Sequence, residues 1–285
     1  MKVSNSPTLA PRSLYRMVAL DIDGTLLGPD GTIGTANRQA VERLKEAGVE
    51  VVLASGRSHG NMMEFHESLG LSSPVVSVHG ALVRDPLGVE LWSHGALDET
   101  LVREVTLAGR QAGVAVLHYR SDGVFLDTES ERTAFDQSRN REPQQLVEDL
   151  LALPGHTHKV MWLAEPEVLA GWAKTATTSV PHWESKLHRL FTDPGYLEFM
   201  PTGVSKAAGV GVVARGLGLE ADQVAAFGDG NNDAPMLAWA GMGVAMPHGS
   251  EAARAAARQV GPEGSADEAL ARALAVVFPS LVRLS

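Results

Sequence analysis

The sequence predicts an α/β fold in which a doubly wound, Rossmann-like parallel sheet carries an inserted α+β domain. Short apolar strands alternate with amphipathic helices near both ends of the chain, a pattern typical of β-α-β units and parallel sheets. From about residue 86 to residue 194 this rhythm gives way to short strands and helices in mixed order. The 285 residues are also enough for two domains of ordinary size.

The first part of the core begins after a polar stretch, residues 1–16, which we expect to be a flexible tail. The strands of this part are predicted at 18–20, 49–54 and 75–78. The helix between the first two strands is expected to have Thr35 as its N-cap and an apolar stripe of helical period. It ends before Gly48, which stands at the left-handed position that closes many helices.

The middle of the chain predicts strands at 89–92, 114–117, 124–126, 159–163 and 196–200, and helices at 99–111 and 167–176. The α/β rhythm then returns with helices at 205–217, 250–258 and 266–277 and strands at 224–227 and 242–245. We therefore assign residues 17–85 and 195–285 to the core and residues 86–194 to an inserted α+β domain.

Composition disfavours several classes of function. Hydrophobic residues make up 44% and charged residues 20% of the chain, as in ordinary globular proteins. No apolar run reaches the roughly 18 residues that a membrane-spanning helix needs, so no membrane partner is expected. The formal charge of −10 disfavours nucleic acid, and the lack of cysteine excludes disulfides and thiolate metal sites. No secretory signal is present, which predicts a cytoplasmic location.

The most informative segment is the strand end at Asp21 and Asp23. Both side chains lie on the same side of an extended backbone, and neighbouring carboxylates resist ionising together, so a cation is expected beside them. Mg²⁺ suits such a site and leaves room for a phosphate oxygen. One carboxylate can then attack phosphorus while the other carries a proton. Asp-x-Asp-Gly is also an ordinary turn sequence, and the segment alone fits either interpretation.

Two later segments add groups that bind phosphate. Ser55 and Gly56 follow the second predicted strand, where a hydroxyl and free backbone N–H groups can hold a phosphate oxygen. The alternative for Ser55 is a helix N-cap. Lys206 stands in the first turn of a predicted helix, where the helix dipole disfavours a cation. Its ammonium can bridge a nucleophile and a phosphate, whereas the alternative is a solvated surface lysine.

A further apolar strand runs directly into acids and amides at residues 227–233. Asp229 is expected to complete the metal site, and Asn232 and Asp233 are expected to support it by orienting ligands. The predicted ligands of Mg²⁺ are Asp21, Asp23 and Asp229. A calcium loop is the alternative, but the spacing lacks the distal glutamate of an EF-hand.

Together the four segments resemble the four motifs of the haloacid dehalogenase superfamily of phosphatases, and the insert between Ser55 and Lys206 resembles the cap of its Cof-type branch, subclass IIB. The resemblance spans nearly the whole chain. It implies that Asp21 is the nucleophile and Asp23 the general acid and base. It further implies that Ser55 and Lys206 bind phosphate, that the late acids hold Mg²⁺, and that the cap covers the site and selects the substrate.

One position departs from the family pattern. Relatives commonly carry Asn-Gly-Ala after the third core strand, where this chain has His79-Gly80-Ala81. His79 is a candidate substrate contact, although we expect a partly buried histidine. Six side chains of the cap are candidates for contact with the leaving group, although each one taken alone is expected on a solvated face. They are His118, Tyr119, Arg120, Lys186, His188 and Arg189.

These residues predict a Mg²⁺-dependent phosphatase that hydrolyses a small phosphorylated metabolite, such as a sugar phosphate, through a phosphorylated aspartate. Two alternatives stay open. A phosphotransferase or mutase would use the same core but exclude water from the intermediate. A non-catalytic phospho-accepting module also combines aspartate, serine and lysine, but it requires neither Asp23 nor a large insert.

Overall fold

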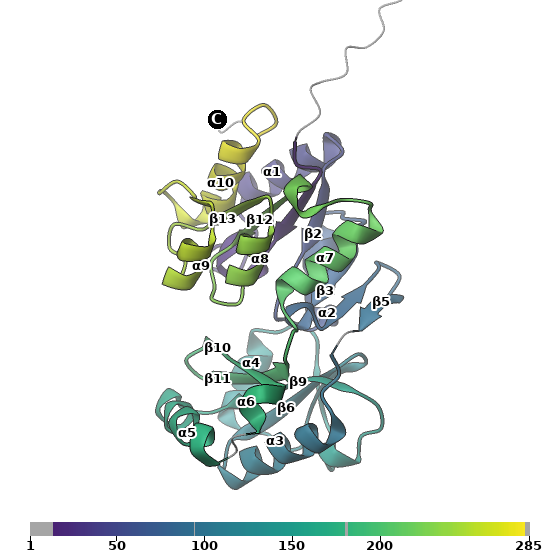
Figure 1. Cartoon of the computed structure of the whole chain (residues 1–285), viewed down its shortest axis with the longest axis vertical. Coiled ribbons are helices and arrows are strands. Elements are labelled where there is room, and N and C mark those ends of the chain that lie inside the picture. Colours follow the sequence, from purple (N-terminus) through teal and green to yellow (C-terminus); the bar gives the residue numbers. More distant parts are fainter. Residues whose placement is uncertain (1–13, 94, 180–181, 283–285) are drawn as a thin grey trace, which may run out of the picture.

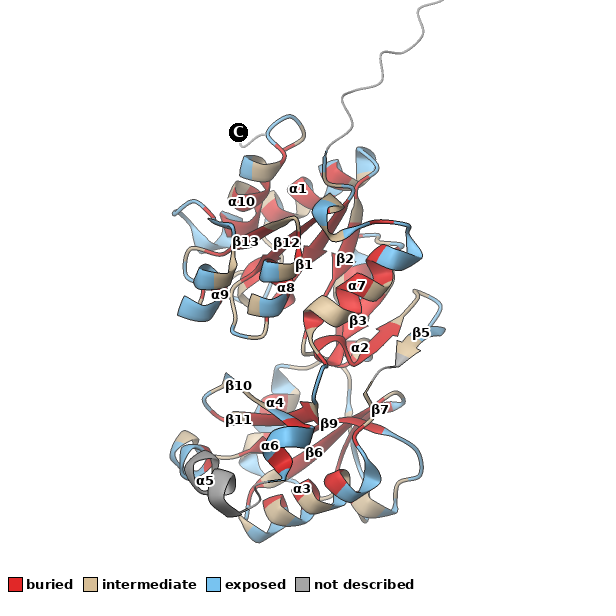
Figure 2. Ribbon diagram, in the orientation of Figure 1, coloured by how far each residue is buried: buried red, intermediate tan, exposed pale blue. Residues whose placement is uncertain are grey.

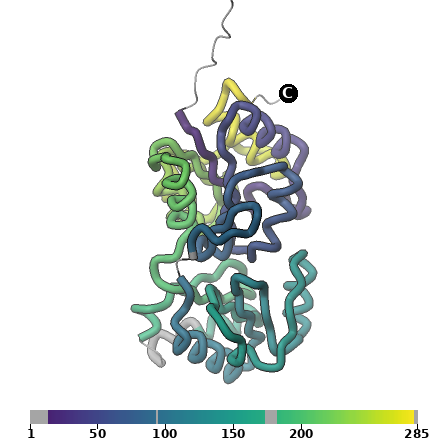
Figure 3. The backbone as a smooth tube through the Cα atoms, turned by 90° about the vertical axis from the view of Figure 1, so that its right-hand side faces the viewer, coloured from purple at the N-terminus to yellow at the C-terminus, as the bar shows by residue number. Residues whose placement is uncertain are grey.

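The described residues of this computed structural model, 14–93, 95–179 and 182–282, build two sheet-based units that lie one above the other (Figure 1). We name the upper unit the core and the lower unit the cap. The chain enters the cap near Gly95 and leaves it near Val204, and the two connections lie side by side (Figure 3). No helix of the described part of the chain combines the length and the apolar character needed to cross a membrane.

The core sheet has five parallel strands in the order β14-β13-β12-β1-β2, which confirms the predicted fold class. They are β1 (Met17–Leu20), β2 (Glu50–Leu53), β12 (Val224–Gly228), β13 (Met242–Ala245) and β14 (Gln259–Val260). A parallel bridge between Ala54 and Val76 joins this sheet to a small antiparallel sheet. The strands of that sheet are β3 (Val75–Ser77), β4 (Leu82–Arg84) and β5 (Glu90–Ser93).

Helices cover both faces of the core sheet, because its buried strands carry apolar side chains on both sides. Val18 and Leu20 of β1 pack with α1, α2 and α10 on one face, and Met17 and Ala19 pack with α7, α8 and α9 on the other. The helices are α1 (Thr35–Glu46), α2 (His59–Ser68), α7 (Lys206–Gly216), α8 (Ala234–Trp239), α9 (Glu251–Ala256) and α10 (Ala269–Val277). The buried strands run through the middle of the core (Figure 2).

The cap contains a six-stranded sheet in the order β10-β11-β9-β6-β7-β8. Its strands are β6 (Ala115–Arg120), β7 (Gly123–Leu126), β8 (Gln144–Leu146), β9 (Thr157–Leu163), β10 (Leu187–Asp193) and β11 (Tyr196–Pro201). Helices α3 (Glu99–Gln111), α5 (Pro166–Ser179) and α6 (Trp183–Lys186) pack on one face around Trp162 and Phe199. The other face, which includes Tyr119 and Met161, is directed toward the core.

Two domain boundaries differ from the expected ones. Strand β11 pairs with β9 and β10, so the cap sheet continues through Pro201 and does not end at residue 194. Strand β5, which was assigned to the cap from residue 86 onward, pairs with β4 beside the core. Both errors arise because the sequence shows only where the alternation of strands and helices changes, whereas hydrogen-bonded pairing decides to which sheet a strand belongs.

The first helix and the tail also need correction. Thr35 is the first residue of α1 and Gly34 is the N-cap, so the expected capping role of Thr35 is wrong. Residues 1–13 of the expected tail lie outside the described residues. The end of that stretch is packed, because Tyr15 lies edge-on against Phe278 with ring centroids 6.2 Å apart.

Four helices and strands of the cap were not predicted: α4 (Glu131–Ser138), α6, β8 and β10. All four are short or largely polar and present several exposed side chains, so they lack the apolar periodicity on which sequence reading depends. Pairing with β7 and β11 stabilises β8 and β10.

Candidate active site

The candidate site lies where the carboxyl ends of the core strands face the cap. Asp21 follows β1, Ser55 comes shortly after β2, and Asp229 follows β12, as the sequence predicts. The parallel register aligns these three strand ends beside one another. The strand order also reverses at β1 and β12, which is where open α/β sheets bind their ligands.

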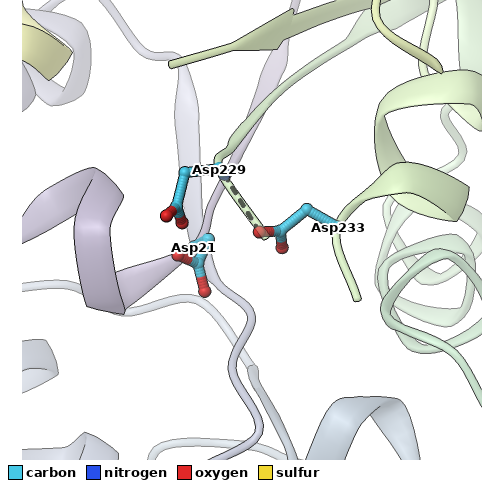
Figure 4. A group of neighbouring side chains, drawn as sticks. All are labelled: Asp21, Asp229 and Asp233. Atoms are coloured by element: carbon cyan, nitrogen blue, oxygen red, sulfur yellow. Dashed lines mark hydrogen bonds between the residues drawn. The ribbon is translucent and has the colours of Figure 1, made fainter. Parts of the chain in front are cut away.

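Three carboxylates meet at this edge, those of Asp21, Asp229 and Asp233 (Figure 4). Each offers an oxygen, and these oxygens lie within 4.8 Å of one another. The buried Lys206 Nζ lies 2.5 Å from Asp21 Oδ1 and 2.6 Å from Asp233 Oδ1. Asp233 Oδ2 also accepts hydrogen bonds from the backbone N–H groups of Asp229 (3.1 Å) and Gly230 (2.8 Å). Asp233 therefore fixes both the lysine and the loop that carries Asp229.

The electrostatics of this group favour a bound cation. Burial raises the pKa of Asp21 well above its usual range, and the Asp233 carboxylate raises it further. The same two causes raise the pKa of Asp229 to about 6. Burial lowers the pKa of Lys206, but the charges of Asp21 and Asp233 outweigh this effect and keep the lysine charged. One ammonium thus faces three carboxylates, and the remaining negative charge suits a hard dication such as Mg²⁺.

Asp23 faces a different partner. Arg57 Nε donates to Asp23 Oδ2 (2.8 Å), and Arg57 Nη2 donates to Asp23 Oδ1 (2.7 Å). Burial raises the pKa of Asp23, but the hydrogen bonds and charge of Arg57 outweigh it, so the pKa lies below its usual value. The carboxylate that we expected among the metal ligands is thus bound to a guanidinium, and the acids that gather around Asp21 are Asp229 and Asp233.

Gly24 shapes the turn that follows Asp23. Its φ is +79°, in the left-handed region that favours glycine, and an added Cβ would lie 2.5 Å from Asp229 Oδ2. Because Gly24 has no side chain, the loop that carries Asp229 can approach the turn that follows Asp23. The Asp-x-Asp-Gly segment is both a turn and part of the site, although the sequence offered these as alternatives.

Ser55 is buried, and its Oγ accepts a hydrogen bond from the backbone N–H of Arg57 (3.2 Å). The N-cap alternative for Ser55 is wrong, because α2 begins only at His59. Gly56 packs against the ring of His79, which lies 2.3 Å from the position of an added Cβ. Ser55 and Gly56 both line the pocket described below, which Asp21 lines as well.

His79 is buried and has partners on both sides. Its Nε2 lies 2.5 Å from Glu198 Oε2 of the cap, and its Nδ1 lies 3.3 Å from Asn232 Nδ2 of the core. The backbone at His79 is left-handed, with a φ of +55°. The histidine is therefore more deeply buried than the partly buried residue that we expected, and it joins the cap to the loop after β12.

A pocket between the core and the cap leads to Asp21. Its core side is lined by Asp21, Asp23, Ser55, Gly56, Arg57, His79 and Asn232. Its cap side is lined by Tyr119, Asp136, Arg139, Asn140, Lys159, Met161, Thr192, Asp193, Tyr196 and Glu198. Of the six cap residues that we expected near the leaving group, Tyr119 alone lines this pocket.

The other expected cap residues lie elsewhere because neighbouring strand residues face opposite sides of a sheet. His118 adjoins Tyr119 on β6 but faces the helices, with its Nε2 2.8 Å from Thr106 Oγ1 of α3. Arg120 pairs with Asp122 (3.0 Å). Lys186, His188 and Arg189 are not among the lining residues.

Sequence reading missed several lining residues, above all Arg57, Lys159 and Glu198. Lys159 and Glu198 are both buried charges: Lys159 directly precedes the apolar run that ends β9, and Glu198 lies between apolar residues of β11. A charge within a predicted buried strand was the signal that could have identified them, since such charges are almost never buried without a partner.

Comparison with known proteins gives a consistent picture. The chain is 29% identical to the HMP-PP phosphatase of Cronobacter sakazakii, over 82% of this chain and 84% of that protein. It is 30% identical to the 5-amino-6-(5-phospho-D-ribitylamino)uracil phosphatase of Bacillus subtilis, over 84% of this chain and 88% of that protein.

Solved structures share the fold. A haloacid dehalogenase-like hydrolase from Bacteroides thetaiotaomicron matches with a TM-score of 0.82 and 23% identity, covering 93% of this chain and 99% of that one. A sugar phosphatase of haloacid dehalogenase subclass IIB matches with a TM-score of 0.76 and 21% identity, covering 93% and 98%.

The doubly wound core, the inserted cap and the buried acids between them define a capped, Rossmann-like hydrolase. The family model of haloacid dehalogenase-like hydrolases matches residues 18–274, and the chain belongs to this family. It is an enzyme, a phosphatase of the Cof-type branch, and its fold is that of subclass IIB structures.

Proposed function

We propose that the protein is a Mg²⁺-dependent phosphatase that hydrolyses a small-molecule phosphomonoester through an Asp21 aspartyl-phosphate. The observation that carries this proposal is the position of Asp21 at the pocket, with its Oδ1 held by Lys206 and with Asp229 and Asp233 beside it. Lys206 binds one oxygen of Asp21, which orients the other toward a bound phosphoryl group.

In the first step the free oxygen of Asp21 attacks phosphorus, and the ester P–O bond breaks. Asp23 gives its proton to the leaving oxygen, so an alcohol departs and Asp23 becomes a carboxylate. In the second step that carboxylate takes a proton from water, and the water oxygen attacks phosphorus. The Asp21–phosphorus bond then breaks, which releases inorganic phosphate and restores both acids.

The residues that would hold Mg²⁺ are Asp21, Asp229 and Asp233, whose oxygens lie within 4.8 Å of one another. The ion would supply positive charge beside the transferring phosphoryl group. Lys206 and Ser55 would bind the phosphoryl oxygens, together with the Gly56 backbone. Asp23 is left out of this proposed metal set, because both its oxygens accept hydrogen bonds from Arg57.

We propose a small phosphorylated metabolite, a sugar phosphate or a related ester, as the substrate. The pocket lies between the core and the cap, and polar and charged side chains from both units line it. Two relatives are named as phosphatases of small metabolites, which supports this size class. The net charge of −10 argues against a nucleic acid. A cytoplasmic location stays a prediction.

Phosphate release from a panel of small phosphomonoesters, measured with Mg²⁺ and after its removal by chelation, tests the proposal. We expect turnover that requires Mg²⁺ and is lost in Asp21→Asn. Undiminished turnover by Asp21→Asn would overturn the assignment of the nucleophile. Assays with added alcohols and sugars separate hydrolysis from phosphotransfer, because a transferase would place the phosphoryl group on the acceptor. A stable phosphoprotein without turnover would indicate a phospho-accepting module.

A further inference from the structure

Three charged or titratable side chains form a buried chain across the boundary between cap and core. Lys159 of β9, Glu198 of β11 and His79 of the core are at most 3% exposed. Lys159 Nζ lies 2.9 Å from Glu198 Oε1, and the other oxygen of Glu198 lies 2.5 Å from His79 Nε2. Removing such groups from water is unfavourable unless each one is paired, and here each one is.

The two outer residues of this buried row, Lys159 and His79, both reach the phosphate site proposed above. Lys159 Nζ donates to the Gly56 carbonyl oxygen (3.0 Å) and lies 3.8 Å from the centre of the Tyr119 ring. At the other end, His79 Nδ1 lies 3.3 Å from Asn232 Nδ2. Gly56 and Asn232 both line the pocket in which Asp21 lies.

The ionised state of Glu198 determines which ring nitrogen of His79 carries the proton. Burial raises the pKa of Glu198, but Lys159 and His79 outweigh it and lower the pKa to about 2. An ionised carboxylate only accepts hydrogen bonds, so the proton of the histidine lies on Nε2. Burial lowers the pKa of His79, which leaves its Nδ1 without a proton. Nδ1 can therefore accept from Asn232 only if the amide nitrogen of Asn232 faces the histidine.

We propose that Lys159, Glu198 and His79 are positioning residues, through which the docked cap orients Asn232 and the Gly56 peptide for phosphate binding. We call this chain of contacts the relay. The inference rests on the proposed function, because it assigns these residues a role at the same phosphate site. The relay makes the phosphate affinity of the core depend on side chains that belong to the cap.

Glu198→Gln separates this role from simple packing, because the two side chains have nearly the same shape. The amide oxygen of glutamine can face Lys159 or His79, but not both. If it faces Lys159, the amide nitrogen needs an acceptor at His79 Nε2, and the histidine proton moves to Nδ1. Two donors then oppose each other between His79 and Asn232, and the asparagine must turn.

The experiment compares the unsubstituted enzyme with Glu198→Gln and with the control Glu165→Gln, which removes an exposed cap carboxylate paired with Arg132. Calorimetric titration with inorganic phosphate in the presence of Mg²⁺ measures binding without a leaving group. We expect binding about tenfold weaker in Glu198→Gln and unchanged in the control, as for loss of a hydrogen bond to a charged group. The ¹⁵N resonances of the His79 ring should show the proton leaving Nε2 in Glu198→Gln alone.

A second variant, His79→Asn, guards against misfolding, because asparagine tolerates the left-handed backbone at this position. It should weaken phosphate binding similarly while unfolding cooperatively on heating. If both variants bound inorganic phosphate as tightly as the unsubstituted enzyme, with only KM or thermal stability changed, the relay would be overturned. Absence of Mg²⁺-dependent turnover in the unsubstituted enzyme would instead overturn the proposed function, and the histidine resonances would still report on the relay.

Discussion

Arg57 binds both carboxylate oxygens of Asp23, with Nε 2.8 Å from Oδ2 and Nη2 2.7 Å from Oδ1. The residue that is proposed to move protons is therefore held in its ionised form by Arg57, which directly follows Ser55 and Gly56 in the sequence. In this state Asp23 is ready to accept a proton from water, and it must gain one before it serves as an acid.

Replacing Arg57 by glutamine should raise the pKa of Asp23, because its main stabilising partner is lost. The low-pH limb of the kcat profile, which would report Asp23 acting as a base, should then move to higher pH. We also expect kcat to fall about tenfold or more through loss of orientation. Arg132→Gln on the cap is the matched control, and an identical pH profile in the two variants would contradict this role of Arg57.

Replacing Lys206 by methionine should reduce kcat by about a hundredfold or more, as for loss of a group that stabilises transition-state charge. It also leaves Asp21 and Asp233 buried without their ammonium, which should destabilise the fold by about 3 kcal/mol. Mg²⁺ would compensate part of that charge. Thermal unfolding should therefore show a larger increase of Tm on adding Mg²⁺ in Lys206→Met than in the unsubstituted enzyme, and equal increases would contradict the metal site.

Replacing Gly24 by alanine should destabilise the protein and weaken Mg²⁺ binding, because its Cβ would lie 2.5 Å from Asp229 Oδ2. Gly31→Ala is the matched control, since Gly31 has a similar φ of +74° but no neighbour within 4 Å. In the control, only the strain of alanine in a left-handed backbone should remain, which lowers the free energy of unfolding by about 1 kcal/mol. Chemical denaturation and Mg²⁺ titration measure both effects, and equal losses in the two variants would show that contact with Asp229 is unimportant.

Glu198 should make stability depend on pH. Its pKa is lowered from 4.5 to about 2 in the folded protein, so its contribution is fully present above pH 4.5 and is lost as the pH falls toward 2. The difference in free energy of unfolding between the unsubstituted enzyme and Glu198→Gln should shrink by about 2 kcal/mol between neutral pH and pH 3. Urea denaturation at several pH values tests this, and a constant difference would contradict the ionised pair with Lys159.

Arg139 lines the pocket from the cap, whereas His188 does not. Arg139→Ala should therefore change KM for esters with bulky leaving groups while leaving inhibition by inorganic phosphate unchanged. His188→Ala should alter neither quantity. A steady-state screen over esters of increasing size measures this, and an effect of equal size in both variants would mean that the pocket lining does not govern preference.

The convergence of the candidate site residues at one edge of the sheet could be predicted, because strand ends can be recognised in the sequence. Asp21, Ser55 and Asp229 each follow an apolar run, and parallel strands bring their carboxyl ends together whatever the details of packing. Lys206 could be placed because it violates a local rule at a helix start. The pairing of Asp23 with Arg57 could not be predicted, since it depends on the exact path of two turns.

The cap side was poorly predicted for a physical reason. Tyr119 and His118 are neighbours in the sequence, yet one faces the pocket and the other faces α3, and only the packing of the sheet decides which. The partners of Lys159 and Glu198 come from strands and turns far apart in the chain. Their burial follows from pairing that no local pattern records.

The side-by-side crossings at Gly95 and Val204 have a consequence for how the enzyme can be altered. The two apolar clusters that flank the core sheet include no described residue between 95 and 203. A short linker that joins these crossings should thus leave a core that still unfolds cooperatively after the cap has been removed. The same junction should also accept another inserted domain, which would test whether the cap determines substrate preference.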